Sequence, residues 1–405
     1  MAESRLPEKA AYTIALLMAL LAGAQVSAAD MAWQQYENGR QAFDARRFDV
    51  ALTDWQNAIA LRKERFALAS ADIEAALRLP EATDSWDRID LIVERLATKE
   101  FGEREFGVIR DSAAGSLRKE MESLHIRTKS PDLANFTRAW LAVEELRGSA
   151  AIHNSLKALQ SLAVELQAYP EAEFGIGRVF FIEGELALAE LQYRKTLDEA
   201  ASLEVPDDRL GVILALAAVH KAKGDWKDYE DDLRLALSDS VIFSSSDDFL
   251  RTAMERALDL QGFDVMLRLY PVDEPKIIDA ASALGEFLLR NGRSQATISL
   301  ALAADAILTR ALAALREYDP ALRYTTLEAF SSLIAERKDL ASWCDEKGLW
   351  KYLYYLGESL LADSRLESGR QLLQGLVASK RSGVWGRAAA QALARPVGKR
   401  PAILP

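Results

Sequence analysis

The sequence predicts an all-α protein that is built of stacked helix hairpins. Half of its 405 residues are hydrophobic, while only 11 are proline, which is typical of helical rather than loop-rich proteins. Apolar residues recur at three- or four-residue intervals in many segments, as expected for amphipathic helices. A pattern of small residues, a turn and bulky residues also returns along the chain, which favours a repeat array over one compact core.

The N-terminus has the features of a secretory signal. Arg5 and Lys9 precede an uncharged apolar run at 10–24, and small residues, Val26 and Ala28, precede a cleavage point after Ala28. The run is short for a membrane-spanning helix, and we expect no transmembrane segment in the mature chain. The sequence therefore predicts a signal peptide at 1–28 and a periplasmic location, with retention as an anchor left open.

The stretch FGIGRVFFIEGELALAELQY, residues 174–193, shows the hairpin pattern. Gly177 and Gly184 would each cost a helix interior up to about 1 kcal/mol. This cost disappears at Gly184 if that residue forms a turn between two helices. Gly177 then becomes a point where the helices cross closely, and we expect Ala189 to face it.

The same pattern returns in four other segments. Its members include Gly39, Phe48, Ala51, Trp55 and Ala58 in the first, Ala217, Gly224 and Trp226 in the second, Gly285 and Gly292 in the third, and Gly357 and Gly369 in the fourth. These residues resemble the tetratricopeptide repeat, a 34-residue helix–turn–helix unit. Residues 32–65 and 170–203 match best, although Arg46 stands where the family has glycine and Thr196 where it has a small residue.

The resemblance implies a right-handed superhelix, or α-solenoid, and a division of the chain along its length. After the signal peptide at 1–28, we expect a first repeat unit at 29–66, degenerate hairpins at 67–169, central units at 170–240, repeat-like and degenerate hairpins at 241–379, and a basic helix and tail at 380–405.

The net charge and a few single residues exclude some classes of function. The formal net charge of −11 argues against non-specific nucleic-acid binding, which depends on basic residues. The basic residues after 379 are interpreted as a final helix and tail, with contact to a partner or membrane as the alternative. We expect Cys344 to be a buried thiol and His220 to be a core histidine.

The resemblance also implies a concave groove lined by the first helix of each unit. The residues it assigns to this partner-binding groove are Trp33, Tyr36, Arg40, Phe43, Phe174, Arg178, Phe181, Tyr354 and Glu358. Arginine can bind carboxylates, and aromatic side chains provide apolar anchors. The alternative is that the aromatic residues pack between neighbouring hairpins.

The sequence is therefore interpreted as a non-catalytic periplasmic scaffold or adaptor of an envelope assembly. It would bind a protein or peptide, with no cofactor and no metal. One alternative is a transport-associated ligand- or peptide-binding protein, which a closed apolar cavity would favour. Another is a peptidoglycan lytic enzyme that uses Glu358 or Glu367 as a general acid.

Overall fold

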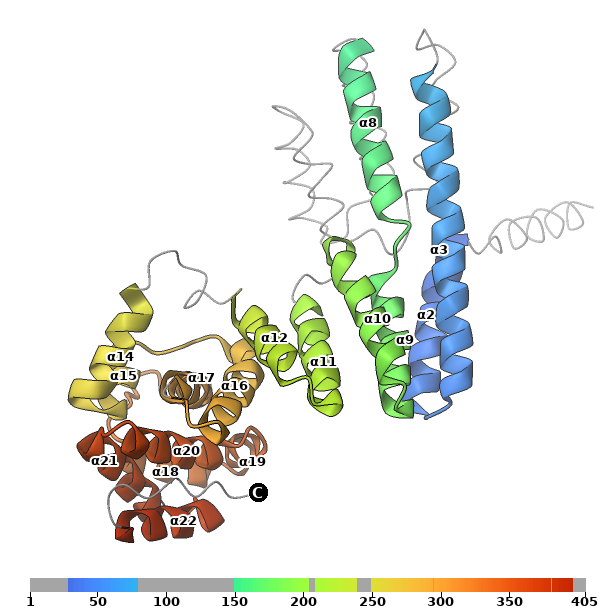
Figure 1. Ribbon diagram of the computed structural model, residues 1–405. Helices are drawn as coiled ribbons and strands as arrows, with labels where there is room; N and C mark the ends of the chain where they lie inside the picture. The colour runs from blue at the N-terminus through green and yellow to red at the C-terminus, as the bar shows by residue number, and fades with distance from the viewer. Residues whose placement is uncertain are drawn as a thin grey trace, which may run out of the picture. The chain divides into compact units, whose positions relative to one another are not determined.

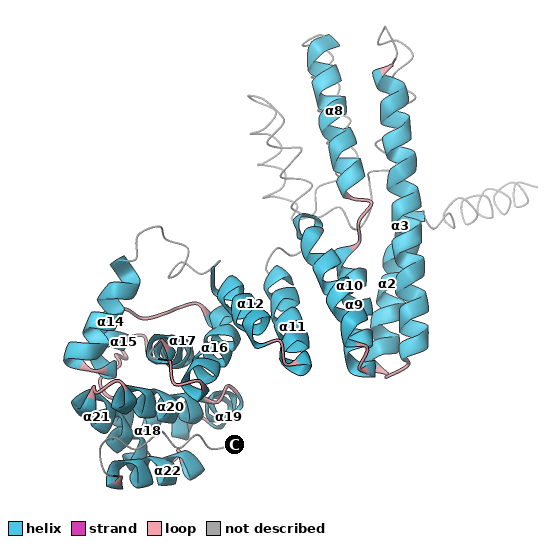
Figure 2. Ribbon diagram, in the orientation of Figure 1, coloured by secondary structure: helices cyan, strands magenta, loops and turns pink. Residues whose placement is uncertain are grey.

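The structure is a computed structural model that describes residues 28–78, 149–203, 208–238, 249–293, 295–379 and 381–395. Every regular element in these ranges is a helix and none is a strand, which confirms the all-α class (Figure 2). Residues 1–27 of the expected signal peptide at 1–28 and the hairpins expected within 79–148 lie outside the described residues. The chain divides into two compact units, Met1–Val219 and His220–Pro405, and the division falls inside α11 (Asp208–Lys223).

The first unit begins with a hairpin of α2 (Ala28–Asp44) and α3 (Phe48–Leu77). Arg46 in the turn has a left-handed backbone with φ of 57°, and its amide donates to the Phe43 carbonyl at 2.8 Å. Gly184 adopts the same region with φ of 83° in the next recognisable hairpin. The turn geometry is thus the same where arginine stands in place of glycine. The left-handed backbone of Arg46 costs about 1–2 kcal/mol of conformational free energy.

That next hairpin consists of α9 (Pro170–Glu183) and α10 (Leu186–Asp198), with Gly184 ending α9 as expected. A Cβ atom on Gly177 would lie 2.5 Å from a ring carbon of Tyr193. The Tyr193 ring, which the sequence did not assign to this crossing, therefore lies nearest to Gly177. Ala189 is nevertheless fully buried.

Trp55 of α3 joins these two hairpins. Cβ atoms on Gly39 of α2 and Gly175 of α9 would lie 2.6 Å and 2.8 Å from its indole ring. The Trp55 side chain also donates from Nε1 to the Tyr36 carbonyl at 3.2 Å. The two best-matching segments therefore pack directly on each other, although more than a hundred residues separate them in sequence.

α3 continues well beyond the first hairpin and packs on α8 (Ser149–Glu165), as Figure 1 shows. The boundary expected at residue 66 thus falls inside one continuous 30-residue helix. Buried Arg62 fixes the base of this pair, because its Nε donates to the Leu166 carbonyl at 3.0 Å and its guanidinium lies 4.4 Å from the Tyr169 ring centroid.

Beyond α10, the unit ends with η2 (Ala200–Ser202) and the first part of α11. Ala189 and Tyr193 of α10 form a second core cluster with Val212, Leu216 and Val219 of α11.

The second unit contains the last residues of α11 and a longer set of helices. In chain order these are α12 (Trp226–Ser238), α14 (Phe249–Gln261), α15 (Phe263–Leu269), η3 (Pro275–Ile277), α16 (Ile278–Arg290), α17 (Ala296–Arg316), α18 (Leu327–Glu336), α19 (Lys338–Glu346), α20 (Leu349–Ala362), α21 (Leu366–Ala378) and α22 (Gly383–Ala394). α17 lies among α15, α16, α19 and α20 and has more buried residues than any other described helix (Figure 1).

α17 has 21 residues and passes the length and apolarity test for a membrane span, which the sequence analysis did not foresee. It is the one helix in the described ranges to do so, and 72% of its most apolar window is buried against other helices. We interpret it as a core helix. Its central Asp305 is fully buried.

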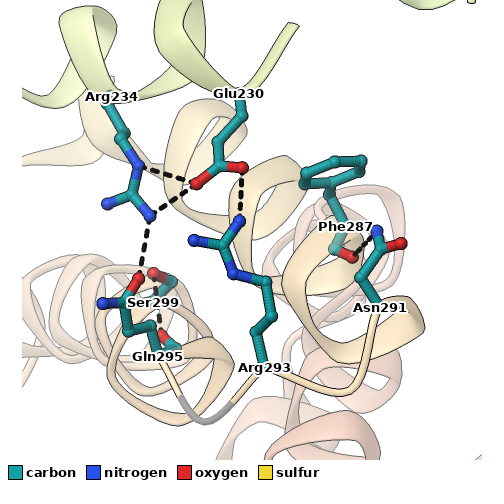
Figure 3. A network of polar contacts seen from close by, with 7 residues as sticks. All are labelled: Glu230, Arg234, Phe287, Asn291, Arg293, Gln295 and Ser299. Atoms are coloured by element: carbon teal, nitrogen blue, oxygen red, sulfur yellow. Dashed lines mark hydrogen bonds and ion pairs between the residues drawn. The ribbon is translucent and has the colours of Figure 1, made fainter. Parts of the chain in front are cut away.

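Charged residues tie α12 to the turn between α16 and α17 (Figure 3). Glu230 accepts from Arg234 at 2.7 Å and also from Arg293, and Arg234 reaches the Gln295 amide oxygen at 2.8 Å. Beside them, the rings of Trp226 and Phe287 stack with centroids 6.1 Å apart.

Two single-residue expectations are confirmed in this unit. Cys344 is fully buried, and burial raises the pKa of its thiol to about 12, so the thiol is neutral at physiological pH. His220 is 2% exposed, with Nδ1 2.6 Å from an Asp232 carboxylate oxygen, as expected for a core histidine. The final helix expected in the basic region is α22.

Candidate functional site

The nine residues assigned to the groove fall into an exposed group and a packed group. Trp33, Arg40 and Arg178 are exposed in the first unit, whereas Tyr36, Phe43, Phe174 and Phe181 contribute to its packing. Tyr354 and Glu358 belong to the second unit and are buried there.

The aromatic residues of α2 support the helix contacts. The Tyr36 ring lies 5.3 Å from the Tyr169 ring, and the Phe43 ring lies 5.8 Å from the Trp55 ring, measured between centroids. Burial raises the pKa of Tyr36 to about 12, and the negative charge of Glu171 adds to this, so its hydroxyl stays neutral.

The aromatic residues of α9, Phe174 and Phe181, also support contacts between helices. The Phe174 and Tyr193 ring centroids are 5.5 Å apart, and Phe181 packs against the core formed by α10 and α11. The alternative left open by the sequence, packing between hairpins, therefore describes these four aromatic residues better than a role as free anchors.

The exposed residues form a surface that is smaller than the groove expected from the sequence. We call it the α2–α9 face and define it as Trp33, Arg40, Arg178 and Ile182. Trp33 is 42% exposed, and Arg40 lies two helical turns further along α2, so both point to the same side. Arg178 and Ile182 are one turn apart on α9, and α2 and α9 are in contact.

Arg178 connects the two helices of this face. Its guanidinium lies 4.2 Å from the centroid of the Phe43 ring, a cation–π contact that holds the charge over α2. Arg40 is held by Glu37, whose carboxylate accepts from Arg40 Nη2 at 2.7 Å and Nε at 3.1 Å. The face thus contains two guanidinium groups that are held by neighbouring side chains, together with an exposed indole and an exposed aliphatic side chain.

Tyr354 and Glu358, the two groove residues assigned to the second unit, are buried in its core. Glu358 is 2% exposed and forms an ion pair with Arg395, whose Nη1 lies 3.2 Å from Oε2. The Tyr354 hydroxyl donates to the other carboxylate oxygen at 3.0 Å, and its ring packs on Trp385. This carboxylate anchors the end of α22 and is not accessible to a polysaccharide, so assigning Tyr354 and Glu358 to an open groove is incorrect. Glu367, the other proposed general acid, is an exposed residue in the first turn of α21.

Comparison with known proteins adds little functional information. No family model and no solved structure matches this chain. A protein of Treponema pallidum (strain Nichols) named "Uncharacterized protein" is 28% identical over 211 residues, which cover 51% of this chain and 56% of the relative. The chain therefore spans about half the length of that relative, whose name assigns no activity.

Among the residues that the structure describes, no three histidine, cysteine or acidic side chains are grouped to hold a metal ion. The α2–α9 face is the candidate site that the following proposal uses. Ile182 was not among the nine residues assigned to the groove from the sequence, and its 53% exposure distinguishes it from the packed Phe181 beside it.

Proposed function

We propose that this chain is an exported, non-catalytic interaction module of the bacterial envelope and that its α2–α9 face docks an acidic segment of a partner protein. The observation that carries the proposal is that exposed Trp33 and Arg40 share one side of α2 and that Arg178 of α9 lies over Phe43 of the same helix. Guanidinium groups bind carboxylates through paired hydrogen bonds, and tryptophan and arginine dominate the binding energy of many interfaces.

The repeated hairpin contact supports a tetratricopeptide-like array as the scaffold. In four hairpins a glycine of the first helix meets a bulky residue of the second, 15 or 16 positions later. The pairs are Gly39 with Trp55, Gly177 with Tyr193, Gly285 with Leu300, and Gly357 with Leu373. The same close crossing within four separate hairpins supports a common repeat unit. Export is supported by the apolar N-terminal run.

Capture from solubilised envelope fractions tests this function. The variant Arg40→Glu/Arg178→Glu should reduce capture of the partner at least tenfold, because reversed charges repel acidic groups. Trp33→Ala should weaken capture by a similar amount through loss of apolar contact. All variants should keep the wild-type helical circular dichroism, since these side chains are exposed.

Arg194→Glu provides the matched control. Arg194 is also an exposed helical arginine in the first unit, and it also pairs with a glutamate one turn away, but it lies on α10. We expect wild-type capture from this variant. Equal capture by Arg40→Glu/Arg178→Glu and Arg194→Glu, with both folded, would exclude the α2–α9 face as the docking surface.

A further inference from the structure

The second unit contains a cleft that the proposed function does not use. It has a volume of about 470 Å³ and lies where the end of α15, the end of α17 and the segment 317–326 meet. This volume lies within the range of small-molecule sites in proteins. The lining combines three arginines, Arg268, Arg316 and Arg323, with an apolar wall of Leu267, Pro271, Leu312 and Ala313.

The three arginines are held in place by neutral acceptors. Arg316 Nε donates to the Leu322 carbonyl at 3.0 Å, and Arg323 Nη1 donates to the same carbonyl at 3.1 Å. Arg268 Nε donates to the Asp264 carbonyl at 3.3 Å. A guanidinium has five N–H donors, so each arginine keeps most of its hydrogen-bonding capacity for another group.

The nearby carboxylates do not neutralise this charge. Within the described part of the chain, no acidic side chain forms an ion pair with Arg268, Arg316 or Arg323. Asp264 accepts instead from the Tyr324 hydroxyl at 2.5 Å and from the Leu327 amide at 3.1 Å. Asp273 is the one acidic residue of the cleft lining. The three arginines therefore give the lining a net positive charge.

The apolar wall distinguishes this cleft from a simple anion site on the surface. Leu267 and Leu312 are buried core residues at the base of the cleft, and the more exposed Ala313 and Pro271 complete its apolar wall. An inorganic anion would use the arginines but leave this wall uncovered. A molecule with an anionic head and an apolar body would satisfy both parts of the lining.

We propose that this cleft binds a small amphiphilic carboxylate, with its head group on Arg316 and Arg323 and its apolar body against Leu267, Leu312 and Ala313. The site is independent of the α2–α9 face and concerns a different class of ligand.

Calorimetric titration of the intact chain with octanoate tests the proposal. We expect saturable binding, at least tenfold weaker binding of the uncharged analogue 1-octanol, and weaker binding of inorganic phosphate, which lacks the apolar body. Arg316→Gln/Arg323→Gln should weaken octanoate binding at least tenfold, because charge-assisted hydrogen bonds to the head group are lost.

Two further variants make the test specific. Arg310→Gln removes an exposed arginine of the same helix that does not line the cleft, and it should bind octanoate like the wild type. Ala313→Phe should fill the cleft and abolish binding while retaining all three arginines. Absence of octanoate binding, equal binding of 1-octanol, or octanoate affinity unchanged in both Arg316→Gln/Arg323→Gln and Ala313→Phe would overturn the proposal.

Discussion

Gly177 determines how closely α9 and α10 approach each other. The Tyr193 ring occupies the space of the missing side chain and is itself 1% exposed, so it has little room to move. We expect Gly177→Ala to lower the free energy of unfolding by about 1–3 kcal/mol through overpacking. Urea denaturation of the purified protein measures this change.

Gly211 is the matched control for that substitution. It lies in α11 of the same unit, and no atom lies within 4 Å of the position that its Cβ would occupy. Gly211→Ala should therefore stabilise the protein by about 0.5–1 kcal/mol, because alanine favours the helix. A shift of both urea midpoints in the same direction would contradict the assigned crossing.

Asp305 makes the stability of the second unit depend on pH. Burial raises its pKa from 3.8 to about 7, although the Val272 amide and the Thr309 hydroxyl lower it by donating to the carboxylate. Between these two values the folded protein binds the proton that the unfolded chain has released. The contribution of Asp305 is thus fully present below about pH 4 and is lost as the pH rises towards 7.

We therefore expect the wild type to lose on the order of 2–4 kcal/mol more stability than Asp305→Asn between pH 4 and pH 8. Urea midpoints at several pH values measure the difference. Asp273→Asn, at an exposed position in the same unit, should follow the wild-type profile. If the profiles of the wild type and Asp305→Asn were parallel, the raised pKa would be incorrect.

At the scale of the helices, turn chemistry was the most informative part of the sequence. Gly184, Gly224 and Gly292 all have positive φ, and each lies in a turn of the hairpin pattern that the sequence predicted. Glycine adopts this backbone without the steric cost of a side chain, which explains why it occupies these turns. Glycines such as Gly177, by contrast, lie inside helices at close crossings. The same signal is absent at Arg46, where only the repeat spacing indicated the turn.

The length of α3 could not be predicted in this way. Residues 67–77 continue the apolar period of the hairpin helix without glycine or proline, so nothing in the sequence separates hairpin from extension. The burial of Glu358 could not be predicted from the sequence either, because its ion-pair partner Arg395 lies 37 residues further along the chain. The cleft lined by arginines has no motif, since its residues come from three separate segments.

Arg62 is the polar residue that fixes the α3–α8 pair to α9. Arg62→Met should destabilise the protein by about 2–3 kcal/mol, because the Leu166 carbonyl loses a charged donor and Tyr169 loses its cation–π contact. Lys63→Met changes the exposed neighbouring residue and should stay within about 0.5 kcal/mol of the wild type. Equal urea midpoints for the two variants would contradict this role.

For the whole molecule, the proposed export would determine which partners the chain can meet. Cleavage after Ala28 or one residue later would give a mature protein that begins at Ala29 or Asp30 and retains nearly all of α2. N-terminal sequencing of the protein released from the bacterial envelope should therefore return one of these residues. Recovery of Met1 would show instead that the apolar segment is retained.

Photo-crosslinking from the α2–α9 face tests the proposed docking most directly. With benzoylphenylalanine at position 33, we expect one discrete adduct in intact cells, and Arg40→Glu/Arg178→Glu in the same chain should remove it. The same probe at position 191, an exposed apolar position on α10 of the same unit, should give no such adduct. Absence of an adduct at position 33, or the same adduct from position 191, would contradict the proposed docking surface.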